Sequence, residues 1–230
     1  VQAPDTLLTF QSLSASVQVM PLFKGRIELD DITLKEASVN TVQLIDGMQI
    51  QGKLGLLKLS SRGIDLSNET ALINSVKLAD THILLNLNDT TETAQDSTAS
   101  ALNWRIMLDE LEAENVSFGM RMPADTLYLS TYLKEAVINN VEARLGEQYY
   151  GLEKLLLQES SVTYDVGRAE PMKGIDPNHI VLRDIYVEVD SVMSSGQEMK
   201  AVIKDIRMAE RSGLSITSLE GRFEMDSSQI

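Results

Sequence analysis

Apolar and polar residues alternate along most of the chain with a period of two, which is the period of a β-strand. The alternation is clear in residues 13–19, 27–30, 180–182 and 185–189. The best helical spacing lies in residues 132–144, where apolar residues three and four apart can share a face. The pattern therefore predicts an all-β protein with at most one short helix.

A short motif recurs within these segments: apolar-x-apolar, two polar residues, then apolar-polar-apolar. Strict copies begin at Leu8, Ile27, Ala71, Ile106 and Ala201, and looser copies begin near Tyr150 and Ile180. In the copy at Ile27, the first apolar pair falls on odd positions and the second pair on even positions. A straight strand would turn the two pairs to opposite faces of the sheet.

The two polar residues at the centre of the motif must therefore form a bulge or a corner that restores the face. They are Asp30-Asp31 in the copy at Ile27, and Arg183-Asp184 and Lys204-Asp205 occupy the equivalent point. A sheet with such a correction in strand after strand bends into a trough. We expect an elongated, curved, antiparallel sheet with one apolar face turned inward.

Two segments interrupt the strand pattern. Residues 88–100 are polar and lack large apolar side chains, and residues 167–178 contain two Gly and two Pro. A turn at 20–25 separates the first strands. We divide the chain into an N-terminal β-repeat segment (1–88), a polar loop or linker (89–100) and a continuing β-repeat segment (101–230).

Composition excludes several kinds of chemistry. The 230 residues include no Cys and two His, so disulfides, thiolate metal sites and His-rich metal sites are not expected. The net charge of −14 disfavours nucleic acid as a partner. We predict no metal, no cofactor and no catalytic residue. A hydrolase with a Ser-His-Asp site at His82 or His179 is a further hypothesis, but no Gly-x-Ser-x-Gly turn supports it.

The stretch 13–39 resembles the AsmA-like proteins, including the TamB group. Family members carry a strand, a Pro-Leu-Leu-x-Gly turn, a strand of the motif above and a step of small residues. Here the turn is 21–25, the strand motif is 27–34 and the step is 37–39. The resemblance covers about the first 40 residues well and the rest as a general pattern.

This resemblance implies a trough of bent β-strands, shaped like a folded taco, with a greasy groove. It further implies a periplasmic protein anchored in the inner membrane, which moves phospholipid to the outer membrane or serves outer-membrane assembly. The chain begins with Val1, and we take it as a fragment whose membrane anchor lies outside it. Phospholipid acyl chains, and outer-membrane assembly proteins, are the partners implied.

We therefore predict a non-catalytic segment that shields acyl chains in an apolar groove. The apolar composition fits a closed sandwich equally well, and the resemblance favours the groove. The alternative is a structural or adhesive β-sandwich that binds protein partners through loops such as 88–100. The residues predicted to line the groove come from the repeats: Ile27, Leu29, Ile32, Leu34, Ile106, Leu108, Leu111, Ile180, Leu182, Ile185 and Val187.

Overall fold

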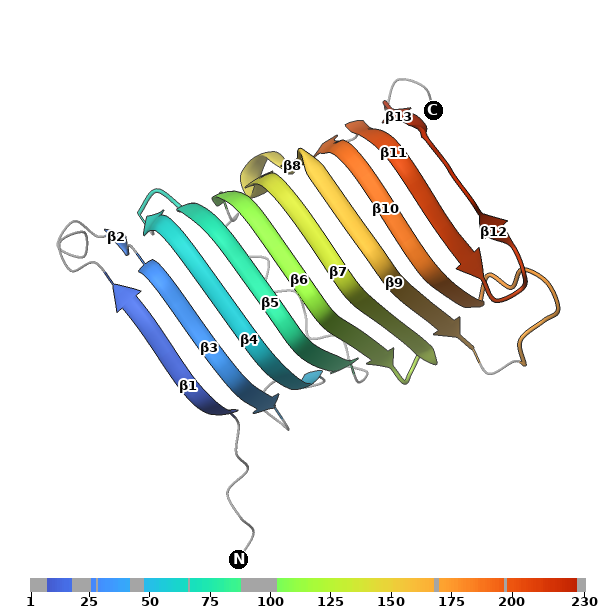
Figure 1. Ribbon diagram of the computed structural model, residues 1–230, viewed down its shortest axis with the longest axis horizontal. Helices are drawn as coiled ribbons and strands as arrows, with labels where there is room; N and C mark the ends of the chain where they lie inside the picture. Colours follow the sequence, from blue (N-terminus) through green and yellow to red (C-terminus); the bar gives the residue numbers. More distant parts are fainter. Residues whose placement is uncertain are drawn as a thin grey trace, which may run out of the picture.

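In the computed structural model, a single layer of 13 strands forms one long, curved sheet (Figure 1). The structure describes residues 8–17, 26–27, 29–41, 48–65, 67–87, 103–167, 170–196 and 198–226. The strands are β1 (Leu8–Val17), β2 (Arg26–Ile27), β3 (Leu29–Asn40), β4 (Met48–Asp65), β5 (Thr70–Leu87), β6 (Arg105–Met122), β7 (Leu127–Arg144), β8 (Tyr149–Leu152), β9 (Lys154–Val166), β10 (His179–Ser195), β11 (Glu198–Glu210), β12 (Ser215–Ile216) and β13 (Gly221–Met225). One 3-10 turn, η1 (Leu145–Glu147), follows β7, and the described residues contain no α-helix.

The strands follow one another across the sheet almost in chain order, from β1 at one edge to β12 and β13 at the other. Strand β9 lies between β7 and β10 beside β8, and β2 pairs with β4. The predicted elongated, curved all-β sheet is confirmed. Every pair is antiparallel as predicted except β5 with β6, which run parallel.

The parallel pair requires a long return between the end of β5 and the start of β6. Residues 88–102, which include the predicted linker, supply it and lie outside the described residues, as does the predicted turn at 20–25. An 18-residue strand such as β5 has a contour of about 60 Å. The 17 residues between Leu87 and Arg105 reach at most roughly 60 Å, which matches the length of strand that the return has to cover. Because β5 pairs with β6, the two predicted segments belong to one sheet.

A first corner crosses the sheet along a line of residues with left-handed backbone. Its members are non-glycine residues with φ between 46° and 53°, namely Glu36, Asp80, Asn115, Glu159 and Asp184. Their pairing partners show that they lie opposite one another from β3 to β10. In β3, β5, β6, β9 and β10, one left-handed residue leaves two consecutive side chains on the outer face, so the alternation restarts with the same inner face. The bulge predicted at Arg183-Asp184 is confirmed.

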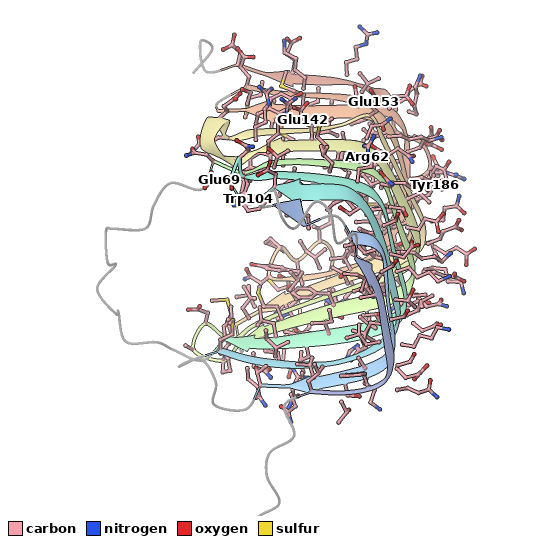
Figure 2. All side chains as sticks on the ribbon, turned by 90° about the vertical axis from the view of Figure 1, so that its left-hand side faces the viewer. Arg62, Glu69, Trp104, Glu142, Glu153 and Tyr186 are labelled. Atoms are coloured by element: carbon pink, nitrogen blue, oxygen red, sulfur yellow. The ribbon has the colours of Figure 1, made fainter. Side chains whose placement is uncertain are left out.

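A second corner crosses the sheet about six residues away from the first in each strand. It is marked by slips of register and by one left-handed residue, Asn140 (φ 52°). In the pairing of β1 with β3, Asp30 is skipped opposite the step from Ser16 to Val17. In the pairing of β10 with β11, Lys204 is skipped opposite the step from Glu188 to Val189. The bulges predicted at Asp30-Asp31 and Lys204-Asp205 are therefore confirmed. Figure 2 shows the result, a wall that turns inward at both ends.

We name three parts of this profile for use below. The middle wall lies between the two corners, the lower wing lies beyond the first corner and the upper wing beyond the second, as oriented in Figure 2. Strand β6, for example, starts in the upper wing at Arg105 and ends in the lower wing at Met122.

The short helix predicted for residues 132–144 is wrong, because this segment lies within β7. Both corners cross the segment, and each leaves two outer residues in succession. Inner residues on either side of a corner are therefore three apart, as Leu133 and Ala136 are. That spacing imitates one turn of a helix.

Candidate functional site

The inner face of the trough is identified by Tyr186, which points outward from the wall in Figure 2. Its neighbours Ile185 and Val187 therefore point inward, because successive side chains of a strand alternate. Residues that pair directly across a sheet share a face. The register of each strand pair thus extends the assignment from β10 to the whole sheet.

Two unbroken rows of aliphatic side chains line the middle wall from edge to edge. The first row contains Leu13, Leu34, Leu57, Leu78, Ala113, Ala136, Leu157, Val187 and Ile206. The second row contains Ala15, Ile32, Leu59, Val76, Leu111, Ile138, Leu155, Val189 and Ile203.

The wings continue the same surface. The inner rows of the upper wing contain Ile73, Leu108, Val141, Leu152, Val192 and Ala201, then Ile64, Ala71, Ile106, Ala143, Tyr150 and Met199. The inner rows of the lower wing contain Leu54, Thr81, Val116 and Leu133, then Ile83, Phe118, Thr131, Val162 and Leu182, then Ile50, Leu85, Met120, Leu129, Tyr164 and Ile180. None of these residues is charged. At the margin, Glu210 pairs with Leu182 and its carboxylate accepts a hydrogen bond from the Ser212 N–H (2.6 Å).

This apolar surface is packed side by side but has no second layer over it. The fully buried apolar residues among those described are Ala37, Ala71, Ala79, Ala113, Val116, Ala136, Ile185 and Val189. Five of these eight are Ala, and no described Leu, Met or Phe is fully buried. In an ordinary globular core the large aliphatic side chains are the ones that disappear from solvent. The trough is therefore open in the described residues, and the closed sandwich is not seen.

The polar groups at the inner side of the corners are satisfied by the backbone. Thr81 is 2% exposed and its hydroxyl donates to the carbonyl of Ala79 (3.0 Å). Ser160 is equally buried and donates to the carbonyl of Gln158 (3.0 Å). Each of these residues follows a left-handed corner residue. The hydroxyls thus stabilise the corners and add no free polar anchor to the trough.

The structure brings nine of the eleven predicted groove residues to one surface. Ile32 and Leu111 lie in one row of the middle wall, Leu34 and Val187 in the other, and Ile185 at the first corner. The wings hold Ile106 and Leu108 above, and Ile180 and Leu182 below. Ile27 pairs with Ile64 and Leu29 with Val17, but their side chains lie outside the described residues.

Sequence reasoning missed more than half of the inner surface. The omitted residues are the inner side chains of β1, β4, β5, β7, β8, β9 and β11 and the lower-wing residues of β6, for example Leu57, Ala136, Leu85 and Phe118. Their signal was present, since Leu133-Lys-Glu-Ala136 is again a pair of polar residues between inner apolar ones. The helical assignment of this segment concealed it.

Charged side chains occupy the outer face (Figure 2). Ion pairs link strands there: Lys77 of β5 pairs with Glu112 of the neighbouring β6 (2.9 Å), and Arg62 of β4 reaches across β5 to Asp109 of β6 (2.9 Å). The hydrogen bond and charge of Glu112 raise the pKa of the Lys77 ammonium above its ordinary value. Because the pairs are half exposed, we assign them to solubility and strand register more than to stability.

The two histidines lie apart from each other and in different surroundings. His82 Nδ1 lies 2.6 Å from Ser117 Oγ on the outer face, beside a depression of about 440 Å³ whose described lining contains no carboxylate. His179 is buried, and its Nδ1 is hydrogen-bonded to the carboxylate of Asp165. A Ser-His-Asp arrangement is therefore not assembled at either histidine within the described residues.

The described residues offer no metal site and no membrane-spanning helix, and the comparisons found no relative. The described residues contain no group of three or more potential metal ligands. No described helix is long and apolar enough to cross a membrane. No protein-family model matches the chain, and no curated protein matches it.

Proposed function

We propose that this chain is a non-catalytic segment of an AsmA/TamB-like periplasmic protein that shields lipid acyl chains in its trough. The proposal extends to transport of phospholipid between the inner and outer membranes, or to outer-membrane assembly, with the anchor in the inner membrane. The observation that carries it is the inner face, whose rows of large aliphatic side chains are uncharged and uncovered. An apolar surface of this extent in water marks a binding surface.

The dimensions of the trough suit an acyl chain. The sheet has ten strand positions from one edge to the other. The nine spacings between them, at about 4.8 Å each, give the trough a length of about 43 Å. Burial of each methylene contributes about 0.8 kcal/mol, so a sixteen-carbon chain gains on the order of 10 kcal/mol. The rows of the middle wall run along the trough, and each successive strand offers a nearly equivalent aliphatic contact. A ligand can then shift from strand to strand without leaving a deep minimum.

Adjacent leucines on β9 provide a direct test. Leu157 lies in an inner row, whereas Leu156 pairs with Val137 and Glu188 on the outer face. A photo-crosslinking amino acid at position 157 should capture phospholipid in cells, and the same probe at position 156 should not. Equal capture at both positions, or none at position 157, would contradict the proposal.

A further inference from the structure

Two loops meet at the lower-wing end of the sheet, near its C-terminal edge (Figure 1). One loop, 170–178, precedes β10, and the other, 211–214, follows β11. Arg211, in the second loop, is bound to the first residues of β10, which directly follow the first loop: its guanidinium donates to the His179 carbonyl (3.2 Å) and its N–H donates to the Val181 carbonyl (3.0 Å). The second loop is therefore held next to the point where the first loop ends.

The two loops expose large apolar side chains. Met172 is 61% exposed, Ile175 is 63% exposed and Leu214 is 50% exposed. The first two are the most exposed large apolar side chains among the described residues. We call these three residues the apolar tip.

The loop that carries Met172 and Ile175 is held in shape by a buried carboxylate. Asp176 is 2% exposed and accepts hydrogen bonds from the N–H groups of Met172 (2.9 Å) and Asn178 (3.0 Å). Its own carbonyl accepts from the His179 N–H (3.1 Å). At the turn, Gly174 has φ of +90°. These bonds hold the backbone so that the two apolar side chains cannot fold back into the protein.

The charge around the apolar tip distinguishes it from the rest of the molecule. Within the two loops, Glu170 and Lys173 cancel, and so do Asp176 and Arg211. The two loops thus carry no net charge on a chain whose net charge is −14. A neutral apolar surface approaches a bilayer without the repulsion that the outer face of the trough would meet at anionic headgroups.

We propose that the apolar tip docks this end of the trough on a lipid bilayer by inserting into the acyl layer. The adjoining rim of the lower wing is also apolar, with Met48, Leu87, Met122, Leu127 and Val166 as the last inner residues of their strands. The tip and the rim form a continuous apolar route from a membrane into the trough. This inference rests on the proposed function, because docking serves a trough that exchanges acyl chains with the bilayer.

The first test is flotation of the full chain with mixed phosphatidylcholine and phosphatidylglycerol vesicles. The unaltered chain should float with the vesicles, and a variant with both Met172→Asp and Ile175→Asp should lose binding by about tenfold or more. Leu219→Asp is the matched control, because Leu219 is also apolar and 46% exposed but lies outside both loops. Equal flotation of the double variant and the control would overturn the inference.

The second test measures which part of the chain enters the bilayer. Trp104, the only tryptophan, is replaced by Phe, and a reporter is introduced by Ile175→Trp or by Leu219→Trp. Brominated acyl chains should quench the reporter at 175 and leave the one at 219 unaffected. Vesicle binding without quenching at position 175 would overturn the inference. It would also be overturned if the unaltered chain formed a dimer and bound no vesicles, and the double variant were monomeric.

The two proposals fail separately. If phospholipid is captured at position 157 but the Met172→Asp, Ile175→Asp variant floats with the vesicles as the unaltered chain does, the docking proposal is wrong and the acyl-shielding proposal is supported. If the tip inserts but no lipid is captured at position 157, the chain binds membranes and the acyl-shielding function is wrong.

Discussion

The first corner allows one substitution to be worked out in detail, Gly55→Ala. Gly55 lies in β4 between Glu36 and Asp80, the corner residues of the two neighbouring strands. A Cβ atom at Gly55 would lie 2.8 Å from Asp80 Cβ, 3.0 Å from the Asp80 carbonyl oxygen and 3.1 Å from the Ala79 carbonyl oxygen. Carbon atoms in contact are normally about 3.5–4.0 Å apart, so the strands must separate by roughly 1 Å.

Most of these obstructing atoms belong to the backbone of a paired strand and cannot rotate away. Overpacking of this kind costs about 1–3 kcal/mol, against which Ala gains about 0.4–1 kcal/mol from the less flexible unfolded chain. We expect Gly55→Ala to lower the free energy of unfolding by about 1–2 kcal/mol.

Gly119→Ala is the matched control, because Gly119 also lies in a central strand. Its added Cβ would approach one flexible group, Leu84 Cδ1 at 3.0 Å, and no backbone atom closer than 3.9 Å. We expect little change or a small gain. Urea unfolding followed by far-UV circular dichroism measures both variants. If Gly55→Ala were as stable as Gly119→Ala, the close approach of strands at the corner would be refuted.

Three further predictions concern the corners and the loop before β10. Glu159→Gly should leave the free energy of unfolding in urea unchanged or raise it, because Glu159 holds a left-handed backbone, whereas Glu135→Gly, at the same corner but without a left-handed backbone, should lower it by about 1 kcal/mol. Equal losses of stability would contradict the role of the left-handed residue. Thr81→Val should cost about 1 kcal/mol in the same assay, because the corner carbonyl loses its donor, and an unchanged midpoint would show that this bond is dispensable. Backbone hydrogen bonds, chiefly from Met172, lower the pKa of Asp176 below its ordinary 3.8, so the loop is stabilised above that value and loses this stabilisation as the pH falls through the lower folded-state pKa. Amide exchange at Met172 should therefore accelerate only in strong acid, and in Asp176→Ala it should be fast at every pH; protection that is independent of both would contradict the anchoring role.

Much of the fold could be predicted from the sequence, because the positions of the bends follow from the pattern of apolar and polar residues. Period-two alternation predicts strands, and a pair of polar residues between inner apolar ones predicts a bulge, as Asp184 shows with its left-handed backbone. The same feature led to the wrong prediction of a helix in β7, since inner residues on either side of a corner are three apart, which is also the spacing of residues on one face of a helix. The parallel pairing of β5 with β6 was not predictable. The polar residues 88–100 show no alternation, and their sequence does not tell whether the chain runs back along the sheet or turns directly into the next strand.

The candidate site was predictable only in part, for a physical reason. The repeats identify which residues share a face, and the structure places Ile32 and Leu111 in one inner row. Whether that face meets a second layer of protein depends on residues far away in the chain, and the same alternation serves both cases. The docking loops were invisible to this reasoning because the exposure of Met172 and Ile175 depends on the hydrogen bonds to Asp176.

The central claim is that the uncovered inner face holds lipid. We would purify the chain without detergent, extract it with organic solvent and quantify phospholipid by mass spectrometry. The account predicts stoichiometric phospholipid, lost in Ile32→Asp and Leu108→Asp and retained in Thr33→Asp, whose side chain shares the outer face with Lys58. All three variants should keep the β-sheet circular dichroism of the unaltered chain. A lipid-free chain, or inner-face variants that unfold while Thr33→Asp does not, would contradict the open trough.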